Sequence, residues 1–206
     1  NGWTVRLLLL GILGGFQGAI GWWMVSSGLS ENMLDVASYR LATHLGLAFI
    51  ILGFILWYIF MMSLSEAEIL ARQRTRDQSI FGKSTGLMHF VFLQILIGAL
   101  VAGIDAGRNY VDWPLMAGGF LPPDLFALEP VWRNFFEDDG LVQFMHRMSG
   151  YILFLFGIFV WYNARKSGNF KIRQAFNVVI LFMFLQMLIG IITVMYSAPW
   201  HIAIFH

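Results

Sequence analysis

Long apolar runs separated by shorter polar connections dominate the chain. Five runs reach the roughly 20 residues that a helix needs to cross a bilayer. They cover about residues 5–25, 41–64, 85–104, 141–162 and 175–196. A sixth run begins near Pro199, a residue suited to the first turn of a helix, and reaches His206. The pattern predicts an all-α integral membrane protein, a helical bundle with five complete transmembrane helices and the start of a sixth.

The composition agrees with a membrane protein. Hydrophobic residues make up 58% of the chain and charged residues 12%, against about 25% charged in a typical soluble domain, and the mean hydropathy is +0.70. The net charge is +1, and no basic cluster with interleaved aromatic residues is present, so we expect lipid around the chain and no nucleic-acid partner. The sequence contains no cysteine, which excludes disulfides, thiolate haem ligation and cysteine metal sites within it.

The loops predict an orientation. Nine of the thirteen Lys and Arg residues fall on one side of the predicted bundle: Arg6, Arg72, Arg74, Arg76, Lys83, Arg165, Lys166, Lys171 and Arg173. By the positive-inside rule this side is cytoplasmic, or faces the matrix in a mitochondrion. The opposite, outer loops, residues 26–40 and 105–140, are longer and acidic.

This orientation places three histidines at one depth. His44, His146 and His206 lie in the second, fourth and sixth runs, all within roughly 5 to 11 Å of the outer helix ends at about 1.5 Å of rise per residue. His89 lies near the cytoplasmic start of the third run, and His201 at the outer mouth. Ionisable residues inside a membrane are costly to bury and mark functional sites. We therefore interpret the three as a layer of ligands.

The chemistry of the layer favours haem. Imidazole is the commonest metal ligand in proteins, and histidines on facing helices commonly hold haem. A zinc site would need three or four converging ligands, and the spans carry no carboxylate. Arg40, one helical turn before His44, and Arg147, next to His146, could pair with haem propionates. The alternative is that each histidine is a packing residue hydrogen-bonded to a neighbour, in a membrane protein without a cofactor.

A short repeat accompanies the histidines. The first, third and fifth runs each carry a Gln-x-x-Ile-Gly box, at residues 17–21, 94–98 and 186–190. Each box precedes a run that bears a histidine. The glutamine and the glycine share a helix face, where a small residue allows close approach of a helix or a flat ligand. Helix packing and contact with a cofactor are both open interpretations.

For the aromatic-rich outer connection, residues 105–140, the alternatives are an interfacial segment and a lid over the outer edge of a haem.

Several motifs together resemble one family. They are GWWMVSSGL (residues 21–29), YRLATHLGLAF (39–49), LVAGIDAGRNYVDWPLMAGGFLPP (100–123), WRNFFEDDGLVQFMHRMSGY (132–151) and SAPWHIAIFH (197–206). In this order they are similar to haem A synthase of the alphaproteobacterial and mitochondrial type, over essentially the whole chain.

The resemblance implies an eight-helix protein made of two four-helix halves related by pseudo-twofold symmetry. Residues 1–64 would then be the second part of the N-terminal half, on the substrate-haem side, and residues 65–84 a cytoplasmic linker. Residues 85–206 would form the C-terminal half, on the haem b side, truncated at its end. His146 and His206 match the pair that ligates haem b, and His44 matches one of the pair at the site where haem O is oxidised, which makes it the catalytic candidate.

The resemblance also implies the reaction, oxidation of the C8 methyl group of haem O to a formyl group for cytochrome oxidase biogenesis by a haem O monooxygenase-type oxidoreductase. The expected location is the bacterial cytoplasmic membrane or the mitochondrial inner membrane, with the histidine layer towards the periplasm or intermembrane space. Haem O synthase, an electron donor and further copies of the chain are candidate partners.

The chain departs from the family pattern in two ways. The family's other N-terminal ligand and its catalytic glutamate belong to an EYxHR-like motif on a helix that this sequence lacks. We therefore expect this stretch to be an internal part of a longer protein and inactive alone. The cysteines that some family members carry in the outer loop are also missing. The rival interpretation from another class is a di-haem b-type membrane cytochrome that exchanges electrons with a quinone.

Overall fold

A computed structural model describes residues 2–28 and 36–206 of the chain. Five long helices account for most of it: α1 (Gly2–Gly28), α2 (Ser38–Met62), α4 (Gln78–Gly103), α6 (Asp139–Ala164) and α7 (Phe170–Met195). All five are long and apolar enough to cross a membrane. The predicted all-α membrane bundle with five complete spans is confirmed.

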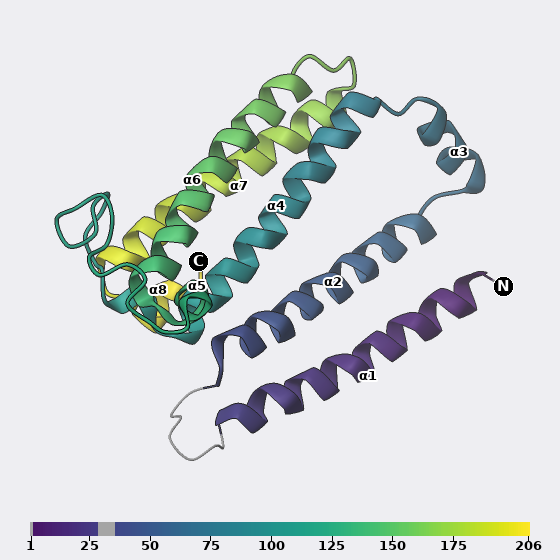
Figure 1. The fold of residues 1–206 in the computed structure, drawn as a ribbon. Coiled ribbons are helices and arrows are strands. Elements are labelled where there is room, and N and C mark those ends of the chain that lie inside the picture. The colour runs from purple at the N-terminus through teal and green to yellow at the C-terminus, as the bar shows by residue number, and fades with distance from the viewer. Residues whose placement is uncertain (1, 29–35) are drawn as a thin grey trace.

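The five helices pack mainly in chain order, α1 against α2, α2 against α4, α4 against α6 and α6 against α7 (Figure 1). Glycines bring α2 close to α4 at two levels. A Cβ atom on Gly103 would lie 2.8 Å from Cα of Ser38, and one on Gly46 would lie 2.7 Å from a methyl carbon of Leu96. Small residues at helix contacts let backbones approach closely where lipid removes the hydrophobic drive for association. This contact joins the α1–α2 pair to the other three long helices.

Side-chain caps fix where the later helices begin. Asp77, Asp138 and Asn169 accept hydrogen bonds from backbone N–H groups in the first turns of α4, α6 and α7. Such caps satisfy donors that a helix start leaves unpaired. The helix α3 (Glu66–Arg74) begins with a reciprocal capping box between Ser65 and Glu68.

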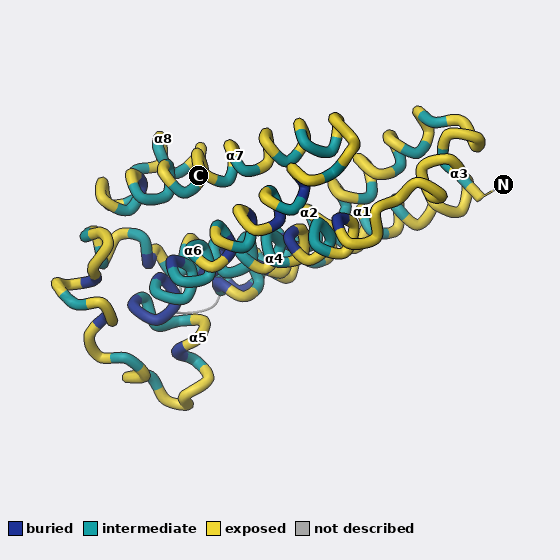
Figure 2. The backbone as a smooth tube through the Cα atoms, turned by 90° about the horizontal axis from the view of Figure 1, so that it is seen from above, coloured by how far each residue is buried: buried dark blue, intermediate teal, exposed yellow. Residues whose placement is uncertain are grey.

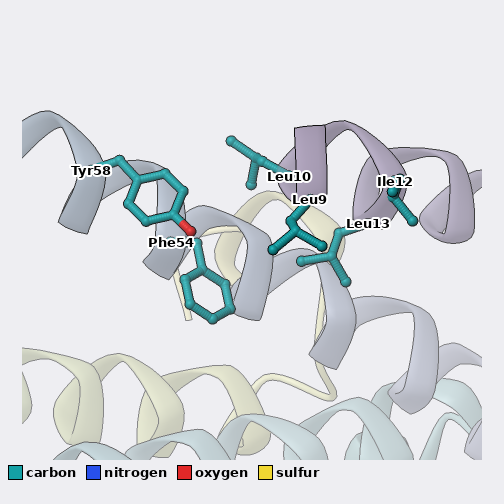
Figure 3. Close-up of a pocket in the computed structure, with 6 residues that line it drawn as sticks. All are labelled: Leu9, Leu10, Ile12, Leu13, Phe54 and Tyr58. Carbon is teal, nitrogen blue, oxygen red and sulfur yellow. The ribbon is translucent and has the colours of Figure 1, made fainter. Parts of the chain in front are cut away.

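The surface of the long helices is mostly exposed, because the rest of the chain buries little of it. Of the five spans, α6 is the most covered, and only 22% of the residues in its apolar stretch are buried. In the apolar stretch of α1 none is buried (Figure 2). Exposed apolar side chains cover the outward faces of the long helices, as expected of a surface that faces lipid or further helices. A hollow between α1 and α2 is lined by Leu9, Leu10, Ile12, Leu13, Phe54 and Tyr58 (Figure 3). It contains none of the histidines.

We call the end of the bundle that carries α3 and the α6–α7 connection the basic end, and the opposite end the histidine end (Figure 1). The long connection between α4 and α6 lies at the histidine end. It contains the short helices η1 (Ala106–Arg108), η2 (Val131–Arg133) and α5 (Asn134–Glu137). Asn134 is fully buried there and bonds the backbone of Leu128 and Val131.

Three details extend the sequence prediction. The segment expected as a linker, residues 65–84, contains α3 and the first turns of α4, which starts at Gln78. The sixth run forms only the short helix α8 (Trp200–Ala203), preceded by Pro199. The predicted outer loop 26–40, with its acidic residues Glu31 and Asp35, lies partly outside the described residues.

Candidate functional site

Two of the three predicted ligands face each other. His146 lies on α6, two turns from its start, and His206 follows α8. Their ring centroids are 6.0 Å apart and the ring planes are nearly perpendicular, at 86°. The return of the chain from α7 through Pro199 into α8 brings these residues, 60 positions apart in sequence, into one place.

His44 occupies the corresponding position on α2, beside α1. Its imidazole packs against Gly21 of the first glutamine box, and a Cβ atom on that glycine would lie 2.9 Å from ring atom Cε1 of His44. The first site is therefore built by α1 and α2, and the second by α4, α6, α7 and the segment after α8.

The glycine of every box lies against a histidine ring. Gly98 faces His146 as Gly21 faces His44, and an added Cβ would be 3.0 Å from Cε1. Gly190 faces His206 even more closely, at 2.5 Å. Any larger residue would displace the imidazole in each case, so the boxes position the histidines themselves.

The box glutamines hold the backbone of the histidine-bearing segments. Nε2 of Gln17 donates to the carbonyl oxygen of His44 at 3.0 Å, and Nε2 of Gln94 donates to that of His146 at 2.9 Å. Gln186 donates to the carbonyl oxygen of Phe205 at 3.3 Å, next to His206. Nδ1 of His206 lies 3.2 Å from the carbonyl oxygen of Gln186 and can donate to it.

The Gln94 amide is bonded on both sides. Oγ of Ser149 donates to its oxygen Oε1 at 2.6 Å, and its nitrogen Nε2 lies 3.0 Å from Nδ1 of His146. Ser149 stands one helical turn after His146 on α6. The same hydroxyl also lies 2.7 Å from the carbonyl oxygen of Met145, so its single hydrogen is shared between that carbonyl and Gln94. The amide of Gln94 thus has a polar neighbour on each side.

Arg147 ties the outer connection to α6. Its guanidinium is buried and donates to the carbonyl oxygens of Tyr110, Asp112 and Leu115, at 2.7 to 3.0 Å. Gln143, one turn earlier, accepts from Arg147 and donates to the carbonyl oxygens of Ala106 and Tyr110. Both terminal nitrogens of Arg147 are thus engaged by protein. Its pairing with a propionate stays a prediction, to which the structure adds a role in shaping the loop.

The same loop segment is closed by Asp112. Its carboxylate accepts hydrogen bonds from the backbone N–H groups of Gly118 and Ala117, both at 3.0 Å. The bond from Gly118, then that from Ala117, and the nearby charge of Arg147 hold the pKa of Asp112 below its ordinary value of 3.8. The carboxylate is therefore ionised and bonded at neutral pH.

Arg40 is bonded differently. Its Nη1 donates to the carbonyl oxygen of Trp23 at 2.7 Å and to Oγ of Ser26 at 3.3 Å, and its guanidinium lies 4.7 Å from the centroid of the Trp23 ring. Its Nε is buried and has no hydrogen-bond partner among the described residues. A buried, unpaired guanidinium N–H fits an anionic ligand.

The two remaining histidines stay apart from the layer. His89 is exposed on α4 and lies 2.8 Å, through Nδ1, from the carbonyl oxygen of Thr85. His201 is exposed and packs against Trp200.

The residues fit haem better than a small metal cage. Within residues 2–28 and 36–206, no group of three or more His, Asp or Glu side chains could enclose an ion. A metal–imidazole bond is about 2 Å long, and the 6.0 Å between the ring centroids of His146 and His206 would let both hold one iron. The unpaired nitrogen of Arg40 also suits an anionic group.

Sequence reasoning missed several residues at this end of the bundle. Ser149 and Gln143 were not singled out, although both lie one turn from a predicted site residue on the same helix. The buried role of Asn134 had no signal in the sequence, because it depends on the turn formed by residues 128–134.

Comparisons with known proteins agree on one family. The family model described as "Cytochrome oxidase assembly protein" matches residues 1–206. The chain is 60% identical over 208 residues to "Heme A synthase" of Ruegeria sp. (strain TM1040) and 58% identical over 205 residues to that of Jannaschia sp. (strain CCS1). It is 53% identical over 206 residues to that of Paracoccus denitrificans (strain Pd 1222).

The matches cover all of this chain but 54 to 55% of those relatives. The chain therefore spans about half the length of the curated relatives it matches. No solved structure matches it.

Proposed function

The chain belongs to the cytochrome oxidase assembly protein family, and from this premise we propose that it is part of a haem A synthase. The whole protein would oxidise the C8 methyl group of haem O to a formyl group for cytochrome oxidase. The observation that carries the proposal is the repeated pairing of a glutamine box with a histidine, found at His44 and again at His146 and His206.

The proposal assigns different roles to the two sites. His146 and His206 would hold haem b between α6 and the segment after α8, and His44 would face the substrate haem O. The haem irons supply the redox chemistry when they are bound. The chain's own contribution is to orient the imidazoles through the boxes and to cover the histidine end with the outer connection that Arg147 holds. Arg40 would bind a propionate through its unpaired Nε.

The division into halves is part of the same proposal. Residues 1–64 would complete the N-terminal, substrate-haem half together with helices outside this chain, and residues 85–206 would belong to the haem b half. Residues 65–84 would connect them on the cytoplasmic side. The distribution of Lys and Arg supports placing the basic end inside and the histidine end towards the periplasm or intermembrane space.

A reduced-minus-oxidised visible spectrum of the purified intact protein, with the extracted haems identified chromatographically, tests the proposal. Haem b together with haem O or haem A is the expected result. Haem b alone, and no haem A after co-expression with a haem O supply, would favour the di-haem cytochrome that exchanges electrons with a quinone. A folded protein without haem would overturn both.

A further inference from the structure

The two complete box–histidine pairs differ in one hydrogen bond. Gln17 and Gln94 hold their helices alike, each donating to the carbonyl oxygen of its histidine. Oε1 of Gln94 accepts from Ser149, whereas Oε1 of Gln17 is buried without a hydrogen-bond partner among the described residues. The same is true of Nδ1 of His44. Besides Nε of Arg40, the α1–α2 site therefore leaves these two polar atoms without a partner in the described part of the chain.

The sequence explains the difference. Ser149 stands three residues after His146, and the residue three after His44 is Leu47, whose side chain cannot donate a hydrogen bond. At the position three residues after the histidine, α6 thus carries a hydroxyl and α2 only a hydrocarbon. Leaving a buried polar atom unpaired destabilises a protein, and such atoms in a native protein call for a functional explanation.

The two unpaired atoms are chemically complementary. Oε1 of Gln17 can only accept a hydrogen bond, and Nδ1 of His44 becomes a donor when the proton of the neutral ring sits on it. In the described orientation the ring instead turns Nε2 towards the amide nitrogen of Gln17, at a long 3.4 Å. A histidine that binds a metal through Nε2 needs that atom free, and it commonly donates its other N–H to a carbonyl or carboxylate oxygen.

We propose that Gln17 is a positioning residue of the substrate site, whose side-chain oxygen accepts the Nδ1 hydrogen of His44 when Nε2 of His44 binds the haem iron. The inference rests on the proposed function, because it takes the α1–α2 site to be a haem site. A turn of the ring would free Nε2, and a turn of the Gln17 amide, which gives up its bond to the His44 carbonyl oxygen, would bring Oε1 to Nδ1. No described hydroxyl holds the oxygen of Gln17, in contrast to that of Gln94, so the amide of Gln17 has one bond fewer to give up.

The test uses the intact protein, co-expressed with a haem O supply, and two variants of Gln17. Gln17→Met keeps the length of the side chain and removes both the acceptor and the amide donor to the His44 carbonyl. Gln17→Glu also loses this donor but keeps a stronger acceptor, so the two variants separate the two losses. Haem content by chromatography, the low-spin b-type spectrum and the midpoint potential of each haem are measured. Gln94→Met is the matched control at the other site.

Loss of such an outer partner commonly reduces metal affinity by about 10–100-fold. We expect Gln17→Met to lower retention of haem O by that factor and raise the midpoint potential of what remains, with the b-type spectrum unchanged. Gln17→Glu should retain haem O and lower its potential, because a stronger acceptor makes the imidazole a better donor to iron. Gln94→Met should affect haem b and spare haem O.

A third variant covers failure of Gln17→Met to fold. Leu47→Ser places a hydroxyl where Ser149 stands in the other pair, and its competition for Oε1 should raise the midpoint potential at the His44 site. Unchanged haem O retention and potential in both Gln17→Met and Leu47→Ser would overturn the positioning role and leave the proposed function standing. A wild-type protein that retains haem b but never haem O or haem A would instead overturn the proposed function, and this inference with it.

Discussion

Arg147 stands out at the scale of single residues, because a charge in a membrane helix is bonded to three carbonyl oxygens of one loop. Arg147→Met should lower the free energy of unfolding by about 3 kcal/mol, since hydrogen bonds to a charged group are worth about 1.5–3 kcal/mol each and the carbonyls would be left unpaired. Thermal unfolding in detergent and protease cleavage within residues 105–138 measure the effect.

The control for this prediction lies on the same loop. The Arg108 side chain is 60% exposed and forms an exposed ion pair with Asp105, which contributes little to stability. Arg108→Met should leave both the unfolding temperature and the cleavage pattern near those of the wild type. Equal effects of the two variants would mean that the Arg147 contacts do not hold the loop.

Asp112 gives the loop a dependence on pH. The pKa of Asp112 in the folded protein is lowered, chiefly by the hydrogen bond from the Gly118 N–H and then by that from the Ala117 N–H. The contribution of Asp112 to stability is therefore complete above its pKa in the unfolded chain, near 3.8. It is lost as the pH falls through the folded pKa. Hydrogen-exchange protection of the Ala117 and Gly118 amides should therefore be constant from neutral pH to about pH 5 and fall below about pH 4.

A substitution separates this carboxylate from general acid effects. Asp112→Ala should remove the protection of both amides already at neutral pH, whereas Asp124→Ala, at an exposed position of the same connection, should leave it intact. Protection that survives in Asp112→Ala would show that the turn forms without the carboxylate.

The residue scale also shows what the sequence could predict of the site. The common depth of His44, His146 and His206 was predicted by counting along apolar runs. The structure brings the rings of His146 and His206 together, and their role as ligands stays a prediction. The second partners could not be predicted in this way. Ser149 acts through a bond to another helix, and Arg147 through a loop whose path no periodicity in the sequence specifies.

At the scale of elements, α4 offers two glycines with opposite surroundings. A Cβ on Gly98 would lie 3.0 Å from the His146 ring, and one on Gly82 would meet nothing within 4 Å. Gly98→Ala should displace the imidazole and reduce the low-spin b-type signal of the intact protein at least about tenfold, the scale of losses at the second layer of a metal site. Gly82→Ala should preserve the signal, and alanine is the better helix former.

The absorption spectrum of the purified variants, normalised to protein, measures this difference. Gly190→Ala extends the test, because its Cβ would lie only 2.5 Å from the His206 ring, so its loss should be at least as large as that of Gly98→Ala. A full b-type signal in both variants would mean that the histidine rings do not need the glycine-lined faces.

The elements themselves were largely predictable, because a length of about 20 apolar residues is a strong signal for a spanning helix. Their ends were less so. Helix α4 begins at Gln78 because Asp77 caps it, several residues before the apolar run starts, and α3 is a polar helix defined by the Ser65–Glu68 box rather than by hydrophobicity. Hydropathy alone predicts neither the start of α4 nor the presence of α3.

At the scale of the whole molecule, the chain repeats one unit, a box helix followed by a histidine-bearing segment. The unit occurs as α1 with α2, as α4 with α6, and as α7 with the segment after α8. The second and third units combine their histidines, and the first joins them through the contact of α2 with α4. This arrangement predicts that the histidines divide into two groups with separate effects.

The division can be tested by removing one imidazole at a time from the intact protein. His146→Ala and His206→Ala should each abolish the low-spin b-type spectrum, because either change removes one of the two side chains that would hold haem b. His44→Ala should spare most of that spectrum and stop formation of haem A, because its site is built by α1 and α2. His89→Ala is the control, since His89 is exposed on α4 and bonds only within its own helix. Damage by His89→Ala equal to that by His146→Ala would contradict the assignment of ligands by depth, and loss of the b-type spectrum in His44→Ala would mean that the two sites are not independent.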